Sequence, residues 1–140
     1  MNLKSIFATL FFTIFLVIFS SAQSAIGVWK TIDDETGEAR SYVEIYEKNG
    51  KLHGKITELL DPESEVCNTC SGDRKGKPLV GMEIIWDMKK SGSTWKGGKI
   101  FSPLKDKTYS CKIWTEGDDK LKVRGYVALF YRTQTWHRIK

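Results

Sequence analysis

Two cysteines, Cys67 and Cys70, are separated by two residues and form the sharpest chemical motif in the chain. In a reducing compartment, beside a strand–helix–strand pattern, this spacing is typical of a thioredoxin-like redox site. A closed zinc site needs four ligands, and only Cys111, His53 and His137 are left to complete one. In an oxidising compartment the same pair predicts a disulfide that fastens a long loop, and this is the interpretation that we favour.

The chain has three cysteines, so one of them is left over. A Cys70–Cys111 bridge closes a longer loop and would stabilise by roughly 4 kcal/mol, against roughly 2 kcal/mol for Cys67–Cys70. Proximity along the chain favours the short bridge. Cys111 alternates with Tyr109 and Ile113 on a face expected to be buried, where a thiol behaves as a small hydrophobe. We therefore expect a Cys67–Cys70 disulfide and a free Cys111.

Polar side chains gather near the carboxyl end of the chain. Counting by two places Arg132, Gln134, Trp136 and Arg138 on one face of an extended segment. If Trp136 points inward, these groups enter an otherwise apolar lumen, which is the pattern of a small-molecule site. Trp29, Arg132, Gln134 and Trp136 are therefore the candidate ligand-binding residues. The alternative is that Arg132 and Gln134 are hydrogen-bonded at the end of the barrel and serve only to close it.

Hydrolytic catalysis has little support in the sequence. There are two histidines, and neither lies in a Gly-x-Ser-x-Gly motif. Strand alternation puts His53 and His137 on outward faces, where we expect both to be solvated. The acidic run from Asp33 to Glu35 lacks the spacing of an EF-hand calcium loop, so we interpret it as a turn. We predict no enzymatic activity, no cofactor and no metal site.

Residues 1–22 have the three-part pattern of a secretory signal peptide. Lys4 supplies the positive charge, Ile6–Phe19 is almost entirely apolar, and Ser20–Ala22 offers small residues for cleavage. The apolar run is too short for a comfortable membrane span, although a retained anchor is the alternative. No cysteine follows the cleavage region, so lipid attachment is not expected. We predict export, and a single domain over residues 23–140.

The charged residues do not indicate a nucleic-acid partner. The formal net charge is +5, but the lysines are scattered between acidic residues, with no run longer than Lys89–Lys90. Such spacing is typical of a solvated surface rather than of a nucleic-acid-binding stripe. We also expect no membrane span once the signal peptide is removed.

The residues beyond the leader alternate between apolar and polar over short stretches that end at turn residues. Asn49–Gly50 is the strongest hairpin signal, because a type I′ turn needs positive φ at both central positions. A connection of 18 residues, 61–78, carries the cysteine pair, and no helical apolar period is present. Eight strands at this spacing predict an all-β, antiparallel up-and-down barrel. The predicted strands are 26–32, 39–47, 51–59, 80–87, 94–101, 108–115, 121–127 and 132–139.

Closing the barrel pairs the first strand with the last and removes both free sheet edges. Trp29 then neighbours the arginines of the last strand, where a cation–π contact is worth roughly 0.5–2 kcal/mol. The residues expected to line the lumen are apolar: Val43, Ile45, Leu52, Ile56, Ile113, Leu121 and Val123.

Several short motifs in a fixed order resemble one known family. They are Gly27–Thr31, Lys51–Ile56, Cys67–Asp73, Pro78–Met82, Trp95–Gly98, Arg124–Tyr126 and Arg132–Trp136. With them, nearly all of residues 23–140 resembles the secreted bacterial family called domain of unknown function 2147. The resemblance implies a lipocalin-like barrel in the bacterial periplasm or outside the cell, and it implies no established activity.

The sequence therefore predicts an exported barrel that binds a small apolar or amphipathic molecule in its lumen. Arg132 is the expected partner of an anionic head group, because its planar fork of donors matches a carboxylate or phosphate. We also expect Arg132 to be buried behind Trp29 and Trp136, which would limit competition from water. The alternative is a structural or protein-interaction module of the cell envelope whose lumen is filled by its own side chains. An open apolar lumen would favour the first function, and a packed lumen the second.

Overall fold

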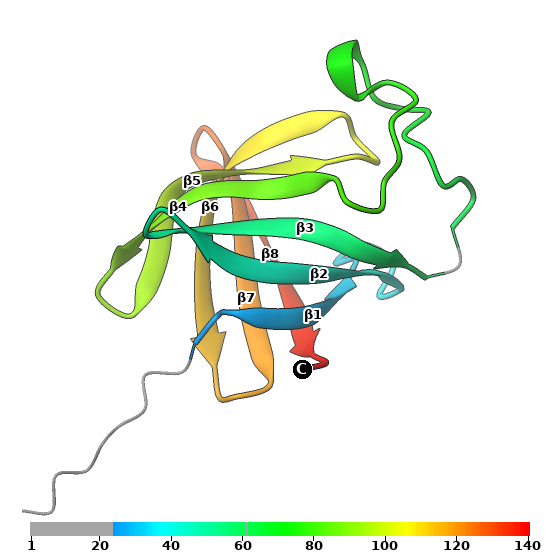
Figure 1. Ribbon diagram of the computed structural model, residues 1–140. Coiled ribbons are helices and arrows are strands. Elements are labelled where there is room, and N and C mark those ends of the chain that lie inside the picture. The colour runs from blue at the N-terminus through cyan, green and yellow to red at the C-terminus, as the bar shows by residue number, and fades with distance from the viewer. Residues whose placement is uncertain (1–23, 61) are drawn as a thin grey trace, which may run out of the picture.

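The computed structural model describes residues 24–60 and 62–140, so the predicted signal peptide lies outside the described residues. Eight antiparallel strands pair in sequence order and close into a barrel, as predicted (Figure 1). No helix in the described part of the chain is long and apolar enough to cross a membrane. The strands are β1 Gly27–Ile32, β2 Ala39–Lys48, β3 Lys51–Leu59, β4 Glu83–Ser91, β5 Thr94–Ser102, β6 Lys107–Glu116, β7 Lys120–Val127 and β8 Phe130–Arg138.

The barrel closes between β1 and β8, where Trp29 pairs with Arg138 and Lys30 with His137. Arg138 lies over the face of Trp29 at 4.2 Å from the ring centre, which confirms the expected cation–π contact. The same guanidinium donates to the backbone oxygens of Ile26 and Ser24 at 3.0 and 2.6 Å. One side chain of the last strand therefore holds the start of the first.

Two turns show how local sequence sets the strand ends. Asn49 and Gly50 have φ of 54° and 74°, as the type I′ hairpin requires. Between β7 and β8 the chain turns at Ala128, whose φ is 52°. This tight turn lets Phe130 pair with Val127, so β8 begins two residues earlier than predicted.

The fourth strand begins at Glu83 and not at Val80 as predicted. The residues just before it form a turn: the backbone N–H of Met82 donates to the carbonyl of Leu79 at 3.1 Å. Gly81 has a φ of 90°, which favours glycine and interrupts an extended conformation. Because Val80 and Met82 are apolar, the strand was predicted to include them. The turn excludes both residues from β4.

One half of the barrel is filled by its own side chains. This closed end carries the β2–β3, β4–β5 and β6–β7 turns and the β1–β8 closure. At Gly98, a Cβ atom would lie 2.2 Å from the carbonyl oxygen of Trp86, so β5 can pack this closely on β4 only with glycine. The fully buried side chains of the closed end are Trp29, Val43, Ile45, Leu52, Ile85, Met88, Ile113 and Leu121.

The long β3–β4 connection folds against the outside of the barrel at the other end (Figure 1). It contains one short 3-10 helix, η1 Gly72–Arg74. The Arg74 guanidinium lies 4.0 Å from the ring centre of Phe101 and 5.6 Å from that of Trp86, which ties this connection to β4 and β5. Thr69 donates to the carbonyl of Pro103 at 2.5 Å in the β5–β6 turn.

Candidate functional site

A cavity of about 730 Å³ occupies the half of the barrel that the core leaves unfilled. It opens at the end that carries the β1–β2, β3–β4, β5–β6 and β7–β8 connections, which we call the open end. Its walls are mostly apolar and come from the inward-facing side chains of the strands and from the β3–β4 connection at the mouth. The apolar wall residues include Ile56, Leu59, Leu79, Ile84, Ile100, Phe101, Tyr109, Val123 and Trp136.

Charged side chains from two connections and from β8 meet across the mouth of this cavity. The Arg132 guanidinium on β8 donates to Asp34 at 2.8 Å and also to Glu35. Lys105 in the β5–β6 turn donates to Glu35 at 3.0 Å. Gln134 adds a hydrogen bond to Asp34 at 3.1 Å. We call these five residues the mouth bridge, because they join the β1–β2 loop to β8 and to the β5–β6 turn.

The mouth bridge changes the acidity of its members. Hydrogen bonds and charge from Arg132 and then Lys105 hold the pKa of Glu35 below its ordinary value of 4.5. The hydrogen bond that Arg132 donates to Glu35 is also the main reason that the pKa of Arg132 is raised. Both side chains are about half exposed, so this is a solvated ion pair that water and salt weaken.

Three of the four candidate ligand-binding residues lie where β8 meets the cavity. Trp136 is buried in its wall, and its indole N–H donates to Gln134 at 2.9 Å. Arg132 also lines the cavity, but at its mouth, with half of its side chain exposed. The expectation that Arg132 is buried behind Trp29 and Trp136 is wrong. Its contact with a ligand stays a prediction, and such a contact would have to compete with Asp34 and Glu35.

Trp29 is the fourth candidate, and the structure does not bring it to the cavity. It is fully buried at the closed end, under Arg138, and its indole N–H donates to the carbonyl of Ala25 at 2.8 Å. Trp29 pairs with the fully buried Val43 on one side and with Arg138 on the other. Arg138 lies two residues beyond Trp136 toward the closed end, so Trp29 and Trp136 lie at different depths in the barrel. Trp29 therefore closes the barrel and does not line the site.

Arg40 is a mouth residue that reasoning from the sequence missed. Its Nε is the one buried side-chain nitrogen or oxygen in residues 24–60 and 62–140 without a hydrogen-bond partner. The nearest carboxylate oxygen, on Asp33, is 3.7 Å away, and Glu38 lies 3.4 Å from the other end of the guanidinium. Arg40 is the extra residue of a β-bulge between the pairs Thr31–Ser41 and Ile32–Ala39, and strand alternation alone does not reveal such a position.

The cysteines pair as predicted. Cys67 and Cys70 form a disulfide in the β3–β4 connection, with their Cα atoms 5.4 Å apart. Cys111 is a free thiol on β6, and burial raises its pKa to about 12. A thiol reacts as its thiolate, so the environment of Cys111 makes it inert. The disulfide lies beside the cavity mouth and not within a catalytic cleft.

The two histidines differ from each other. His137 is exposed, as predicted, whereas only 8% of His53 is exposed. His53 does point outward, but it stacks on Tyr46 and its Nδ1 hydrogen-bonds to Glu83. The prediction that His53 is solvated is therefore wrong, because a cross-strand aromatic ring and a carboxylate cover it. Among residues 24–60 and 62–140, no group of three His, Cys, Asp or Glu side chains is placed to hold a metal ion.

Comparisons with known proteins agree with this fold. A solved structure described as protein HP1028 from the human pathogen Helicobacter pylori, which belongs to the lipocalin family, has a similar fold with a TM-score of 0.73. The two chains are 20% identical, and the similarity covers 84% of each. No curated protein matches the sequence. A family model described as uncharacterized protein conserved in bacteria matches residues 27–138. With its lipocalin-like barrel, the chain therefore belongs to this bacterial family, DUF2147.

Proposed function

We propose that this protein binds one small apolar or amphipathic molecule in the cavity of its open end. The observation that carries the proposal is a cavity of about 730 Å³ with apolar walls and a polar mouth. This volume lies within the range of roughly 300–1,000 Å³ that is typical of small-molecule sites. A barrel that served only as a rigid module would gain stability by filling this space, as the closed end is filled.

The arrangement of polar groups supports an amphipathic ligand. The apolar part would lie among Ile56, Ile100 and Val123, and the polar part would reach the mouth. The unpartnered Nε of Arg40 offers a donor there, while Arg132 is already bound to Asp34 and Glu35. A ligand group that accepts hydrogen bonds is therefore better matched to Arg40 than to Arg132.

The proposal includes export to the periplasm or the outside of a bacterial cell. Residues 1–22 have the pattern of a cleavable signal peptide, and the Cys67–Cys70 disulfide is of a kind that persists in oxidising compartments. N-terminal sequencing of the accumulated protein tests this part: a start at Gln23 is expected, and a start at Met1 would contradict it.

Ligand binding is tested with a neutral fluorescent amphiphile, N-phenyl-1-naphthylamine, whose emission rises in apolar surroundings. The Val123→Trp variant places an indole in the cavity and should weaken binding at least about tenfold, equivalent to about 1.4 kcal/mol. The matched control is Leu129→Trp, because Leu129 is 94% exposed and does not line the cavity. Equal affinity in wild type and Val123→Trp, with both folded by melting temperature, would refute a ligand site in the lumen.

Native mass spectrometry of protein purified from its own bacterium then identifies the molecule. A bound molecule that co-purifies with wild type and Leu129→Trp, but not with Val123→Trp, would be the natural ligand, and its mass would identify it. Catalysis does not form part of the proposal, because the charged groups at the mouth are engaged with one another rather than poised around a reacting atom.

A further inference from the structure

Four cations form a row across the outside of the barrel. The register of β4 to β7 places Lys89 opposite Lys96, Lys96 opposite Lys112, and Lys112 opposite Arg124. The lysines and the arginine come from four different strands, so their neighbourhood is invisible in the linear sequence. We call these four residues the cation row.

This arrangement is unfavourable for the isolated protein. Like charges placed directly opposite each other on neighbouring strands are destabilising. No ion pair within residues 24–60 and 62–140 involves Lys89, Lys96, Lys112 or Arg124. The cation row is therefore left uncompensated, and an external anion would relieve the repulsion.

Aromatic rings hold part of the cation row in place. The Arg124 guanidinium lies between Trp114 and Tyr131, at 4.8 and 4.3 Å from the ring centres, and its Nε donates to Thr133 at 2.8 Å. The Lys112 ammonium lies 5.5 Å from the ring centre of Trp114. Such contacts position the charges without neutralising them, so their field remains directed outward.

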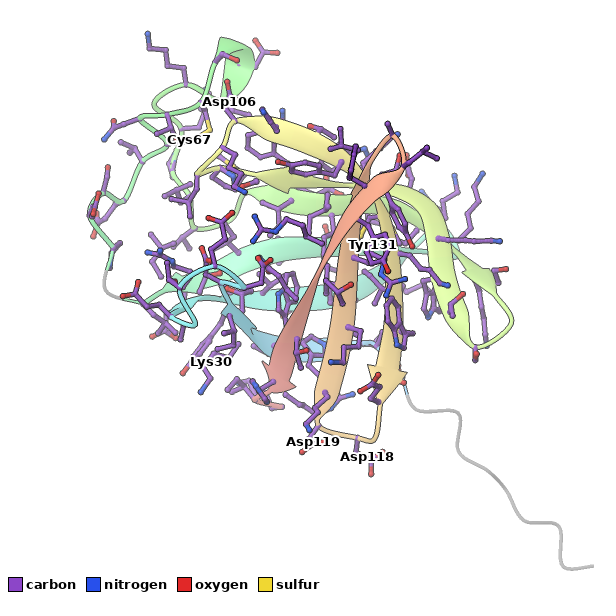
Figure 2. The ribbon with its side chains drawn as sticks, turned by 180° about the vertical axis from the view of Figure 1, so that it is seen from behind. Lys30, Cys67, Asp106, Asp118, Asp119 and Tyr131 are labelled. Atoms are coloured by element: carbon purple, nitrogen blue, oxygen red, sulfur yellow. A yellow bond between two sulfur atoms is a disulfide. The ribbon has the colours of Figure 1, made fainter. Side chains whose placement is uncertain are left out.

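An exposed apolar tip adjoins the same face of the barrel. The β7–β8 turn projects at the end opposite the turn of Asp118 and Asp119, as Figure 2 shows. Leu129 is 94% exposed, Phe130 80% and Val127 56%, and Leu104 in the β5–β6 turn is also exposed. Tyr131 links the two features, since it stacks on Arg124 and follows Phe130 in the chain. We call Val127, Leu129, Phe130 and Leu104 the apolar tip.

We propose that the cation row and the apolar tip dock this barrel on an anionic lipid bilayer. A surface that binds a membrane peripherally has two parts. Its cations contact the phosphate head groups, and its apolar and aromatic side chains enter the interfacial region of the bilayer. The cation row supplies the charge complementarity. The apolar tip supplies apolar contacts with lipid, which a hydrophilic polyanion could not make.

A second copy of the chain fits this surface less well. A two-fold symmetric dimer places the same patch of both subunits together, and here that would bring two cation rows against each other. A nucleic acid or another soluble polyanion would satisfy the cation row but leave the apolar tip in water. Leu104, Val127 and Phe130 also line the mouth of the cavity, whereas no residue of the cation row does, so the charge variants test docking separately from ligand binding.

The test is flotation of the protein with vesicles of phosphatidylglycerol and phosphatidylcholine in equal amounts, compared with vesicles of phosphatidylcholine alone. The protein is expressed with its whole sequence in a bacterium, and every variant has the same N-terminus. Differences between variants therefore report on the surface and not on the leader. Wild type should bind the anionic vesicles more tightly, and added salt should weaken the binding.

Two double variants separate the contributions. Lys96→Gln with Lys112→Gln should weaken binding to the anionic vesicles about fivefold for each cation removed. Leu129→Ser with Phe130→Ser should weaken binding to both kinds of vesicle. The matched controls lie away from the strands of the cation row: Lys30→Gln on β1 with Lys48→Gln on β2 for charge, and Ile139→Ser, 42% exposed in wild type, for apolar area. These controls should bind like wild type.

Four outcomes would overturn the proposal. The first is equal flotation of wild type and both double variants. The second is tight binding to polyphosphate or duplex DNA that the tip variant keeps in full, which would make the partner a soluble polyanion. The third is competition by inorganic phosphate beyond the effect of sulfate at matched ionic strength, which would indicate a free-phosphate site. The fourth is a dimer in sedimentation that the tip variant abolishes, which would make the partner a second copy.

Discussion

Arg132 on β8 and Asp34 in the β1–β2 loop are 98 residues apart in the chain, and their side chains meet at 2.8 Å across the mouth of the cavity. With Glu35, Lys105 and Gln134, this contact joins the β1–β2 loop, the β5–β6 turn and β8 around the mouth. The same strand holds the other end of the barrel through Arg138. β8 therefore fastens the closed end and spans the open one.

The first prediction concerns the acidity of Glu35. The pKa of Glu35 is lowered in the folded state. The stabilisation that its ion pairs give to the folded protein is therefore fully present above pH 4.5, and it is lost as the pH falls through the lower pKa of the folded state. NMR titration of the side-chain carboxyl carbons should find Glu35 below 4.5. In Arg132→Met the pKa should return most of the way toward the ordinary value.

The matched control for this titration is Arg124→Met, which removes a cation that makes no ion pair with Glu35. This control should leave the titration of Glu35 unchanged. A Glu35 pKa that is the same in wild type and Arg132→Met would show that the mouth bridge does not form in solution.

The second prediction separates two arginines of β8. Arg138→Ala removes the cation–π contact with Trp29 and hydrogen bonds to Ile26 and Ser24, so the free energy of unfolding should fall by about 2–3 kcal/mol. Arg132→Ala removes only solvated ion pairs and should leave the free energy of unfolding nearly unchanged. Urea unfolding of both variants provides the comparison.

The exposed neighbour His137 gives a control for general effects at this strand end, and His137→Ala should unfold like wild type. A larger loss of stability in Arg132→Ala than in Arg138→Ala would reverse this assignment. It would make Arg132 the residue of barrel closure, which was the alternative considered from the sequence.

The third prediction concerns the free thiol of Cys111. Burial raises its pKa from 9.0 to about 12, which leaves about a thousandfold less thiolate at pH 8. A disulfide reagent such as Ellman's reagent should therefore not label the folded protein on the timescale of minutes. In guanidinium chloride, without reductant, one thiol per chain should react.

A double variant provides the reference rate, with Cys111→Ser and with Ser110→Cys on the exposed face of the same strand. This variant should be labelled rapidly while folded. Two reactive thiols or more in unfolded wild type would contradict the Cys67–Cys70 disulfide, and rapid labelling of the folded wild type would contradict the burial of Cys111.

The fold could be predicted from the sequence because its signals are local. Alternation of apolar and polar residues, the turn at Asn49–Gly50 and the spacing of eight segments together specify a closed antiparallel barrel. Two predicted strand limits differ from the structure. The fourth strand does not begin at Val80, because the apolar residues there belong to a turn, and the last strand begins earlier, at Phe130, because the chain turns tightly at Ala128.

The site was only partly predictable, because alternation tells which face a residue occupies but not its depth in the barrel. Trp29 and Trp136 both face inward, yet Trp136 lines the cavity and Trp29 fills the closed end. The partners of Arg132 come from a loop far away in the sequence. The cation row is a similar case: lysines that look scattered along the chain become neighbours through strand register.

The packed half of the barrel blocks the cavity at one end, so the cavity is open only at the other. An occupant enters and leaves by the same aperture, so loading and unloading exclude each other and cannot proceed from opposite sides. The aperture opens at the end that carries the apolar tip, away from the closure held by Arg138 over Trp29. A ligand bound as proposed would therefore be released only toward whatever that one rim faces, so the orientation of the whole molecule would set the direction of release.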